Sequence, residues 1–327
     1  MMQTGAPKVE INEVGPRDGL QIEPVNVPTT EKIALVDALS TCGFARIEVT
    51  SFTSPKAIPA LADAQQVMQG IRRQQSVIYT ALVPNIRGLE RARECGMDEI
   101  NLVMSASETH NRANLRMTRE QSQAELLGIL DAASRGAALP CNVSLSTVFG
   151  CPFEGDVSVD EVIRLARRFV DAGASGITLC DTTGMAFPTQ VAEICERVQA
   201  AVGSIPLTIH LHNTRGMALA NAVAAWQCGV TRFDAAAGGL GGCPFAPGAS
   251  GNVATEELVH MFQCMGVATG VDLSRLLEVV RGLPSLVQRD FNLPLLAAGD
   301  RLRTHPAPSW LAERFPSNST TPSVLQQ

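Results

Sequence analysis

The sequence is 327 residues long and acidic, with a formal net charge of −6 and a pI near 5.5. A nucleic-acid binder usually carries a basic face, so this charge argues against that class of partner. The nine cysteines form no CxxC pair and no regular spacing, which argues against a zinc knuckle or a disulfide scaffold and indicates a reduced, cytoplasmic protein. We find no signal peptide and no apolar stretch near the roughly twenty residues of a membrane span, so we expect neither secretion nor membrane insertion.

Short apolar runs recur along the chain, and most are followed by a segment with helical periodicity. The runs that we predict to be strands cover residues 8–14, 46–51, 77–83, 99–105, 141–148, 176–182, 207–213 and 232–237. Apolar residues at three- and four-residue spacing predict helices over residues 30–42, 60–73, 119–133, 159–172, 188–202 and 217–228. Several of these helices end at a glycine, such as Gly43 or Gly173, which is the usual left-handed stop before the next strand.

Eight strand–helix units predict a parallel sheet covered on both faces, and eight strands close such a sheet into a (β/α)8 or TIM barrel. The core would consist of aliphatic side chains, since 45% of the residues are hydrophobic and only 4% are aromatic. An open, doubly wound sheet is the alternative, but no GxGxxG motif follows the first strand. We expect extra C-terminal helices over residues 254–266 and 272–290 to complete one domain, residues 1–303. Residues 304–327 are expected to form a mobile tail.

Two histidines stand two residues apart in the seventh predicted strand, residues 207–213 (LTIHLHN). Because side chains alternate between the two faces of a strand, His210 and His212 point the same way and can share one metal ion. The alternative is that one or both are core histidines satisfied by neighbouring backbone. Further metal ligands at the same end of the barrel would favour the first interpretation.

Polar residues at the carboxyl ends of other predicted strands supply such ligands, and active residues of these barrels lie at that end. Asp18 follows the first strand and offers a carboxylate oxygen, although it could also be a turn residue that bonds its own backbone. Its neighbour Arg17 could be a surface arginine, but a guanidinium beside a metal-bound carboxylate is suited to neutralising a developing oxyanion. Glu48 interrupts the apolar second strand, where an unpaired carboxylate would be strongly destabilising, so we expect it to pair with Arg17.

The loop after the eighth predicted strand, residues 238–252, contains six glycines and a central Cys-Pro-Phe. Glycine allows close approach to a ligand and also permits motion, so the loop is interpreted as a lid, with a flexible connector as the alternative. In a lid, Cys243 becomes a candidate acid or nucleophile, and Asn252 becomes a neutral oxygen ligand for the same ion. Mixed oxygen and imidazole ligands suit Mg²⁺, Mn²⁺ or Zn²⁺.

These residues resemble the hydroxymethylglutaryl-CoA lyase family, within a larger group of metal-dependent barrel lyases and Claisen-type synthases. The resemblance runs from about Val9 to Asp290. It rests on residues 14–21 (VGPRDGLQ), 47–52 (IEVTSF), 54–56 (SPK), 150–155 (GCPFEG), 238–244 (GGLGGCP) and 251–256 (GNVATE). The last two motifs distinguish the lyases from the synthases.

The resemblance implies that one Mg²⁺ or Mn²⁺ ion is held by Asp18, His210, His212 and Asn252. It also implies that Arg17 stabilises an enolate, that Cys243 transfers a proton, and that Glu48 belongs to the supporting charged network. The residues to which we assign substrate binding are Arg17, Gln21, Ser107 and Thr182.

The reaction so implied is a retro-Claisen cleavage of 3-hydroxy-3-methylglutaryl-CoA, or of a closely related branched 3-hydroxyacyl-CoA, to acetyl-CoA and a 3-oxo acid. The ion would bind the tertiary hydroxyl and the free carboxylate of the acyl group, the hydroxyl would lose its proton, and the C2–C3 bond would break. A small-molecule acyl-CoA is thus the expected partner. The resemblance also implies a homo-oligomer and a role in leucine degradation.

Three departures from the family pattern bear on the acyl group and on CoA binding. Many of the lyases have Asp at the position of Asn213, whereas the related synthases have Asn, as this sequence does. Residues 105–112 (SASETHNR) differ from the lysine-containing run of the mitochondrial members, and Pro24 replaces a basic residue. Asn213 motivates the alternative of a Claisen-type synthase or aldolase that acts on a 2-oxo acid. Outside catalysis, a separate alternative is a barrel retained as a metal-binding scaffold.

Overall fold

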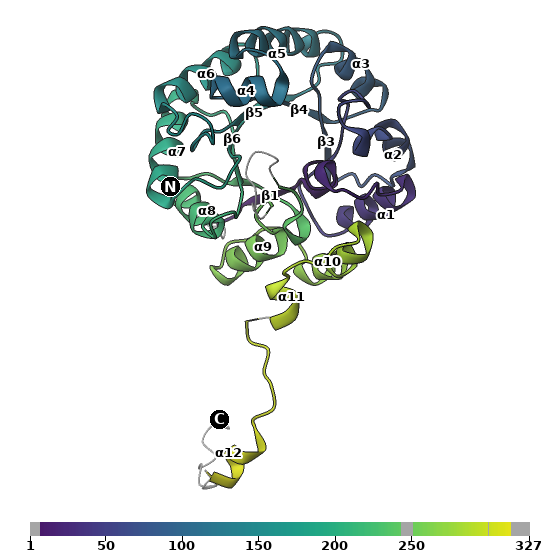
Figure 1. The fold of residues 1–327 in the computed structure, drawn as a ribbon, viewed down its shortest axis with the longest axis vertical. Helices are drawn as coiled ribbons and strands as arrows, with labels where there is room; N and C mark the ends of the chain where they lie inside the picture. Colours follow the sequence, from purple (N-terminus) through teal and green to yellow (C-terminus); the bar gives the residue numbers. More distant parts are fainter. Residues whose placement is uncertain (1–6, 243–250, 300, 315–327) are drawn as a thin grey trace, which may run out of the picture. The chain divides into compact units, whose positions relative to one another are not determined.

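Eight parallel strands form the centre of the computed structural model, which describes residues 7–242, 251–299 and 301–314. Each strand pairs with the next along the chain and β8 pairs with β1, so the sheet closes and the predicted TIM barrel is confirmed (Figure 1). The strands are β1 (Glu10–Glu13), β2 (Arg46–Ser51), β3 (Ile78–Leu82), β4 (Glu99–Ser105), β5 (Cys141–Ser146), β6 (Gly176–Asp181), β7 (Leu207–Leu211) and β8 (Arg232–Ala235).

Helices surround the barrel as a ring (Figure 1). In chain order they are α1 (Thr29–Ser40), α2 (Ala64–Gly70), α3 (Ile86–Glu94), α4 (Glu108–Leu115), α5 (Arg119–Ser134), α6 (Val159–Asp171), α7 (Pro188–Val202), α8 (Ala218–Gln227), α9 (Thr255–Cys264) and α10 (Leu273–Val287). Short helical turns follow three of the strands, namely η1 (Gly15–Gly19) and η2 (Leu20–Ile22) after β1, η3 (Pro59–Leu61) after β2 and η4 (Ala237–Gly239) after β8. No helix of the described residues is long and apolar enough to cross a membrane.

A separate unit begins at Leu293, after the barrel unit ends at Asn292. It contains α11 (Pro294–Ala298) and α12 (Ser309–Arg314). The segment predicted to be a mobile tail from residue 304 thus includes a short helix, and its last residues, 315–327, lie outside the described part of the chain. The domain boundary at residue 303 stays a prediction.

The predicted and observed elements differ mainly where polar residues mask or interrupt the helical pattern. β2, β4 and α7 have the predicted bounds, but the helix expected over residues 60–73 is divided into η3 and α2. It stops early because Ile71 adopts an extended conformation. The helices α3 and α4 were not among the predicted segments, since α3 buries only Gly88, Leu89 and Ala92 and α4 is short and polar.

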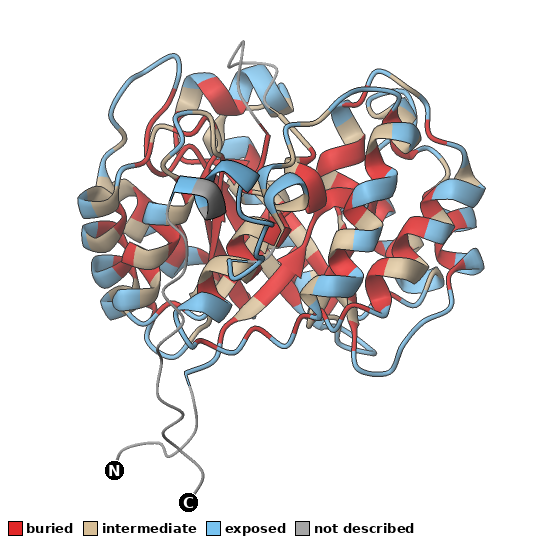
Figure 2. Ribbon diagram, turned by 90° about the horizontal axis from the view of Figure 1, so that it is seen from below, coloured by how far each residue is buried: buried red, intermediate tan, exposed pale blue. Residues whose placement is uncertain are grey.

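The apolar core lies between the strands and the helices. Ile11, Ile47, Ile177 and Phe233 are completely buried, and the ring of Phe233 lies 5.2 Å from that of Phe262 on α9. Figure 2 shows buried residues along the strands and on the inner faces of the helices, with exposed residues on the outer faces of the helices. The helices therefore hold the strands by burying aliphatic surface on one side of the sheet.

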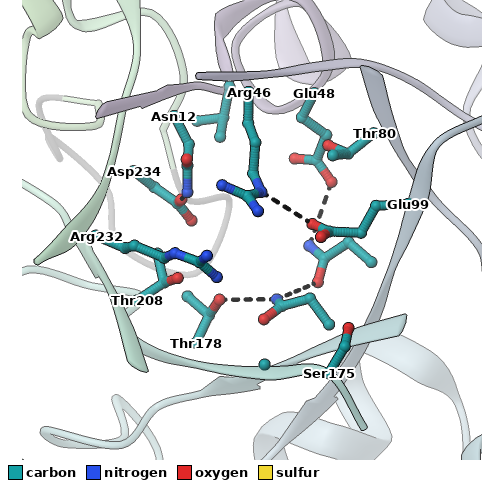
Figure 3. Close-up of a pocket in the computed structure, with 14 residues that line it drawn as sticks. Asn12, Arg46, Glu48, Thr80, Glu99, Ser175, Thr178, Thr208, Arg232 and Asp234 are labelled. Atoms are coloured by element: carbon teal, nitrogen blue, oxygen red, sulfur yellow. Dashed lines mark hydrogen bonds and ion pairs between the residues drawn. The ribbon is translucent and has the colours of Figure 1, made fainter. Parts of the chain in front are cut away.

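The inner face of the barrel is polar, although the strands were predicted from short apolar runs. Because side chains alternate along a strand, the neighbours of the outward apolar residues point inward. They surround a cavity of about 40 Å³, shown in Figure 3, and include Asn12, Thr80, Asn101, Asn142, Thr178, Thr208 and Asp234. The Asn142 amide donates to Asn101 Oδ1 at 3.0 Å and to Thr178 Oγ1 at 2.8 Å, so half-buried and buried polar groups satisfy one another across strands.

The end of α10 is fastened to the loop that follows β1. Arg289 donates two hydrogen bonds to the Glu23 carboxylate, from Nε to Oε2 at 2.9 Å and from Nη2 to Oε1 at 2.7 Å. Glu23 is buried, and a two-pronged guanidinium–carboxylate pair is geometrically specific. The extra C-terminal helices thus support the turn from which Arg17 and Asp18 project.

Two glycines that follow helices have similar φ angles but different surroundings. Substituting each by alanine therefore separates the backbone strain of a positive φ from the steric clash of an added Cβ. Gly43 has a φ of 91° and Gly173 a φ of 96°, but a Cβ on Gly43 would lie 2.3 Å from Gly270 O, whereas a Cβ on Gly173 would meet open space. We expect Gly173→Ala to lower the free energy of unfolding by about 1 kcal/mol, and Gly43→Ala to lower it by about 1–3 kcal/mol more. Urea unfolding of both variants measures this difference, and equal losses would contradict it.

Candidate metal centre

The four predicted metal ligands come together at the carboxyl end of the barrel. Asp18 lies in η1, directly after β1, while His210 is on β7 and His212 follows it by two residues. One ligand atom from each of these three side chains lies within 4.8 Å of the others, and the two Nε2 atoms are 3.2 Å apart. Two ring nitrogens at this separation, facing a carboxylate, have the geometry expected of ligands to a common cation.

Asn252 completes the cluster from the far end of the glycine-rich loop. It forms a β-bridge with His212, and its Nδ2 donates to Asp18 Oδ2 at 2.8 Å and to Leu240 O at 2.9 Å. Its Oδ1 is buried and has no hydrogen-bond partner among the described residues. A buried amide oxygen without a partner is unfavourable unless a cation or another donor faces it, which fits the predicted ligand role.

The charge states of these groups suit cation binding. Burial by itself would raise the pKa of Asp18, but the charges of Arg17 and of the two histidines outweigh it and lower that pKa to about 2. Burial and the neighbouring His210 lower the pKa of His212 to about 4. At neutral pH the site therefore presents an ionised carboxylate and a neutral imidazole at these two positions, the forms that bind metal.

Arg17 pairs with Glu48, as the sequence predicted. Its Nε donates to Glu48 Oε2 at 2.7 Å, and its Nη1 donates to Asp18 Oδ1 at 2.7 Å. Burial disfavours the charge on Arg17, but the two carboxylates outweigh burial and raise its pKa, so the guanidinium stays charged beside the metal ligands. Asn101 donates to the other oxygen of Glu48 at 3.2 Å and links this ion pair to the polar interior.

Two of the predicted substrate-binding residues meet through a residue that the sequence analysis did not single out. Ser107 Oγ lies 3.1 Å from Thr147 Oγ1, and the Thr147 backbone N–H donates to Thr182 Oγ1 at 2.8 Å. Thr147 has a φ of 59°, which is strained for a β-branched residue. Gln21 lies in η2, and its buried Oε1 has no partner among the described residues. The assigned roles of Gln21, Ser107 and Thr182 stay predictions.

Two buried carboxylates that we did not assign fasten the start of the glycine-rich loop. Glu13 accepts hydrogen bonds from the backbone N–H of Gly15 and of Ala237, and Glu256 accepts one from Gly238 at 3.0 Å. Burial raises the pKa of each to about 7. Glu13 was visible in the sequence as a charge inside an apolar strand, and this was the signal that had drawn attention to Glu48. Cys243, the predicted proton donor, lies outside the described residues.

A closed (β/α)8 barrel with imidazole, carboxylate and amide groups gathered at one rim has the build of a metal-dependent barrel enzyme. The family model described as HMGL-like matches residues 8–282, and the chain belongs to this family. The membership that the sequence motifs predicted is thereby confirmed.

Curated relatives and solved structures agree with this assignment. The chain is 50% identical over 274 residues to the hydroxymethylglutaryl-CoA lyase YngG of Bacillus subtilis. This alignment covers 84% of this chain and 91% of the relative. It is 43% identical over 297 residues to the (R)-citramalyl-CoA lyase of Chloroflexus aurantiacus, an alignment that covers 85% of this chain and 93% of the relative. An HMG-CoA lyase of Acinetobacter baumannii, solved with coenzyme A and 3-methylmalate, superposes with a TM-score of 0.89 at 49% identity, covering 94% of this chain and 100% of that one.

Removing Glu48 tests the importance of the buried ion pair. We expect Glu48→Ala to lower the free energy of unfolding by about 3 kcal/mol, because the buried charge of Arg17 then keeps only one of its two carboxylates. Urea unfolding at fixed ionic strength measures the loss. The control is Asp131→Ala, which breaks an exposed ion pair with Arg135 and should leave stability close to that of the wild type. A Glu48→Ala variant as stable as this control would contradict the assignment.

Proposed function

We propose that the protein is a divalent-metal-dependent carbon–carbon lyase that cleaves 3-hydroxy-3-methylglutaryl-CoA, or a closely related branched 3-hydroxyacyl-CoA, to acetyl-CoA and a 3-oxo acid. The observation that carries the proposal is the convergence of Asp18, His210, His212 and Asn252 beside the Arg17 guanidinium. The close relatives named as lyases of CoA thioesters support it.

The proposed ion is Mg²⁺ or Mn²⁺, and the residues present fit it. Two imidazole nitrogens, one carboxylate and one amide oxygen form a mixed, oxygen-containing ligand set, and the buried Asn252 Oδ1 is left available for a cation. When bound, such an ion lowers the pKa of a hydroxyl group and orients the atoms that it holds. Asp18 and His212 would hold it in their ionised and neutral forms, respectively.

Arg17 would stabilise the charge that appears when the C2–C3 bond breaks. The electron pair of that bond passes to the thioester as an enolate, whose oxygen becomes negative. Arg17 is buried, permanently charged and fixed by Glu48 and Asp18, so it need not reorganise during the reaction. The enolate carbon must then gain a proton, and Cys243 stays the predicted donor.

The acyl group is proposed to contact Gln21 and the hydroxyl cluster of Ser107, Thr147 and Thr182. These hydroxyl groups lie after β4, β5 and β6, at the same end of the barrel as the metal ligands. The Acinetobacter baumannii relative was solved with 3-methylmalate, a ligand that carries both hydroxyl and carboxylate groups, as the proposed acyl group does. The relative named (R)-citramalyl-CoA lyase supports a different branched acyl group as an alternative substrate.

Asn213, one of the departures from the family pattern, contacts the start of α8. Its Oδ1 accepts the backbone N–H of Ala218 at 3.2 Å. An Asp carboxylate could accept the same hydrogen bond, so this contact does not decide between a lyase and a synthase or aldolase. A cytoplasmic location, a homo-oligomeric state and a role in leucine degradation stay predictions.

Metal removal tests the dependence on a cation. We expect EDTA to abolish thioester cleavage and Mg²⁺ or Mn²⁺ to restore it, and we expect Asp18→Ala to lower kcat/KM by about 1,000-fold or more with the fold retained. Activity assays and circular dichroism measure the two effects. Asp160→Ala is the control, since Asp160 is an exposed residue on α6. Full turnover after EDTA treatment would refute the metal-dependent mechanism.

A panel of thioesters tests the reaction and the acyl group. We expect cleavage of one or more branched 3-hydroxyacyl-CoA substrates, with acetyl-CoA and an oxo acid identified by mass, because the ligand set is built to hold a hydroxyl and a carboxylate together. The same preparation is assayed for acetyl-CoA-dependent condensation with 2-oxo acids. Condensation without cleavage would identify a synthase, and bound metal without either reaction would identify a scaffold.

A further inference from the structure

The polar cavity inside the barrel reaches the metal site through two acidic residues. Both Glu48 and Asp234 line this cavity, as Figure 3 shows. Glu48 holds Arg17, as described above. Asp234, which lies on β8 on the other side of β1 from Glu48, makes an equivalent contact: its Oδ2 lies 3.3 Å from Nδ1 of His210. Only the first of these contacts was expected from the sequence.

Asp234 is held in place by the register of the strands. It lies on β8, where its strand partners are His210 on β7 and Asn12 on β1. Partners in adjacent strands of a barrel project to the same side, so all three side chains point inward. Asn12 Nδ2 donates to Asp234 Oδ1 at 2.9 Å. One carboxylate oxygen is therefore anchored by Asn12, and the other is directed at the histidine.

A carboxylate at Nδ1 determines what the opposite nitrogen of the ring can do. A neutral imidazole carries one proton, and an acceptor beside Nδ1 favours the tautomer in which Nδ1 has it. The lone pair is then on Nε2, the atom that faces His212 across 3.2 Å. Nδ1 of His212 is buried without a hydrogen-bond partner among the described residues, so the two histidines are supported differently.

We propose that Asp234 is a positioning residue that fixes the ring orientation and the tautomer of His210, so that Nε2 is offered to the metal ion. This inference rests on the proposed function, because it assumes that His210 binds a cation. Asp234 itself faces Nδ1, on the opposite side of the ring from Nε2.

Metal affinity without substrate tests the proposal on the full-length protein. We expect Asp234→Ala to weaken Mn²⁺ binding by about 10–100-fold, as is typical when a partner of a ligating histidine is removed. Asp234→Asn should weaken binding less, since an amide oxygen can still accept the Nδ1 proton. Titration of Mn²⁺ by electron paramagnetic resonance measures both affinities, and thermal unfolding checks the fold.

The matched control is Glu99→Gln. Glu99 lines the same cavity, and its side chain is about as buried as that of Asp234, but among the described residues it pairs with Arg46 and not with a proposed metal ligand. We expect its Mn²⁺ affinity to remain within about twofold of the wild type. Histidine ¹⁵N spectra of the metal-free protein at alkaline pH provide a second readout. They should show the Nδ1-protonated tautomer of His210 in the wild type and lose it in Asp234→Ala.

The outcomes separate this inference from the proposed function. Wild-type affinity in both Asp234 variants would overturn the positioning role, and if Asp234→Ala does not fold, wild-type affinity and an unchanged tautomer in Asp234→Asn would do so. Wild-type protein that binds no Mn²⁺, or a His210→Ala variant that binds it as tightly as the wild type, would instead overturn the metal site.

Discussion

The polar inner face of the barrel is the constraint on which the rest of the site depends. The carboxylates and amides enclosed by the strands are buried or half-buried, so a partner from a neighbouring strand stabilises each of them. Glu48 is satisfied by Arg17 and Asn101, and Asp234 by Asn12 and His210. In each case one partner, Asn101 or Asn12, lines the cavity, and the other, Arg17 or His210, belongs to the candidate metal centre. The requirement to satisfy buried groups thereby also orients the groups used for chemistry.

Closure of the barrel brings the two ends of the barrel sequence to one place. Asn252 donates a hydrogen bond to Asp18, which lies 234 residues earlier in the chain. The pairing of β1 with β8 sets this contact, and Glu13 reinforces it by accepting hydrogen bonds from Gly15 on one side of the seam and Ala237 on the other. A site assembled from the first and last strands is complete only when the sheet has closed.

Much of this arrangement could be predicted from the sequence because it follows from simple periodicity. Alternation along β7 placed His210 and His212 on one face, and the parallel topology placed Asp18 at the same rim. The Arg17–Glu48 pair could be predicted because an isolated charge in an apolar strand needs a partner. These inferences require only the spacing within one strand, or the shared end of several.

The remaining contacts depend on which residues of adjacent strands are level with each other, and one sequence does not fix that register. Asp234 is partnered with His210 and Asn12 only through the pairing of β8 with β7 and β1. The strained backbone of Thr147 is also invisible, because threonine is common in strands and rarely adopts a positive φ. The candidate metal ligands could thus be predicted from the sequence, whereas the contact of Asp234 with His210 could not.

The ion pair between Glu23 and Arg289 joins residues that are 266 positions apart. A ribosome adds residues in order, so the turn after β1 emerges first and acquires this restraint only when almost the entire barrel sequence has been translated. The growing polypeptide therefore lacks this ion pair until late in its synthesis. A message truncated shortly before codon 289 would yield a product with a nearly complete barrel sequence but without this restraint on the turn that carries Arg17 and Asp18.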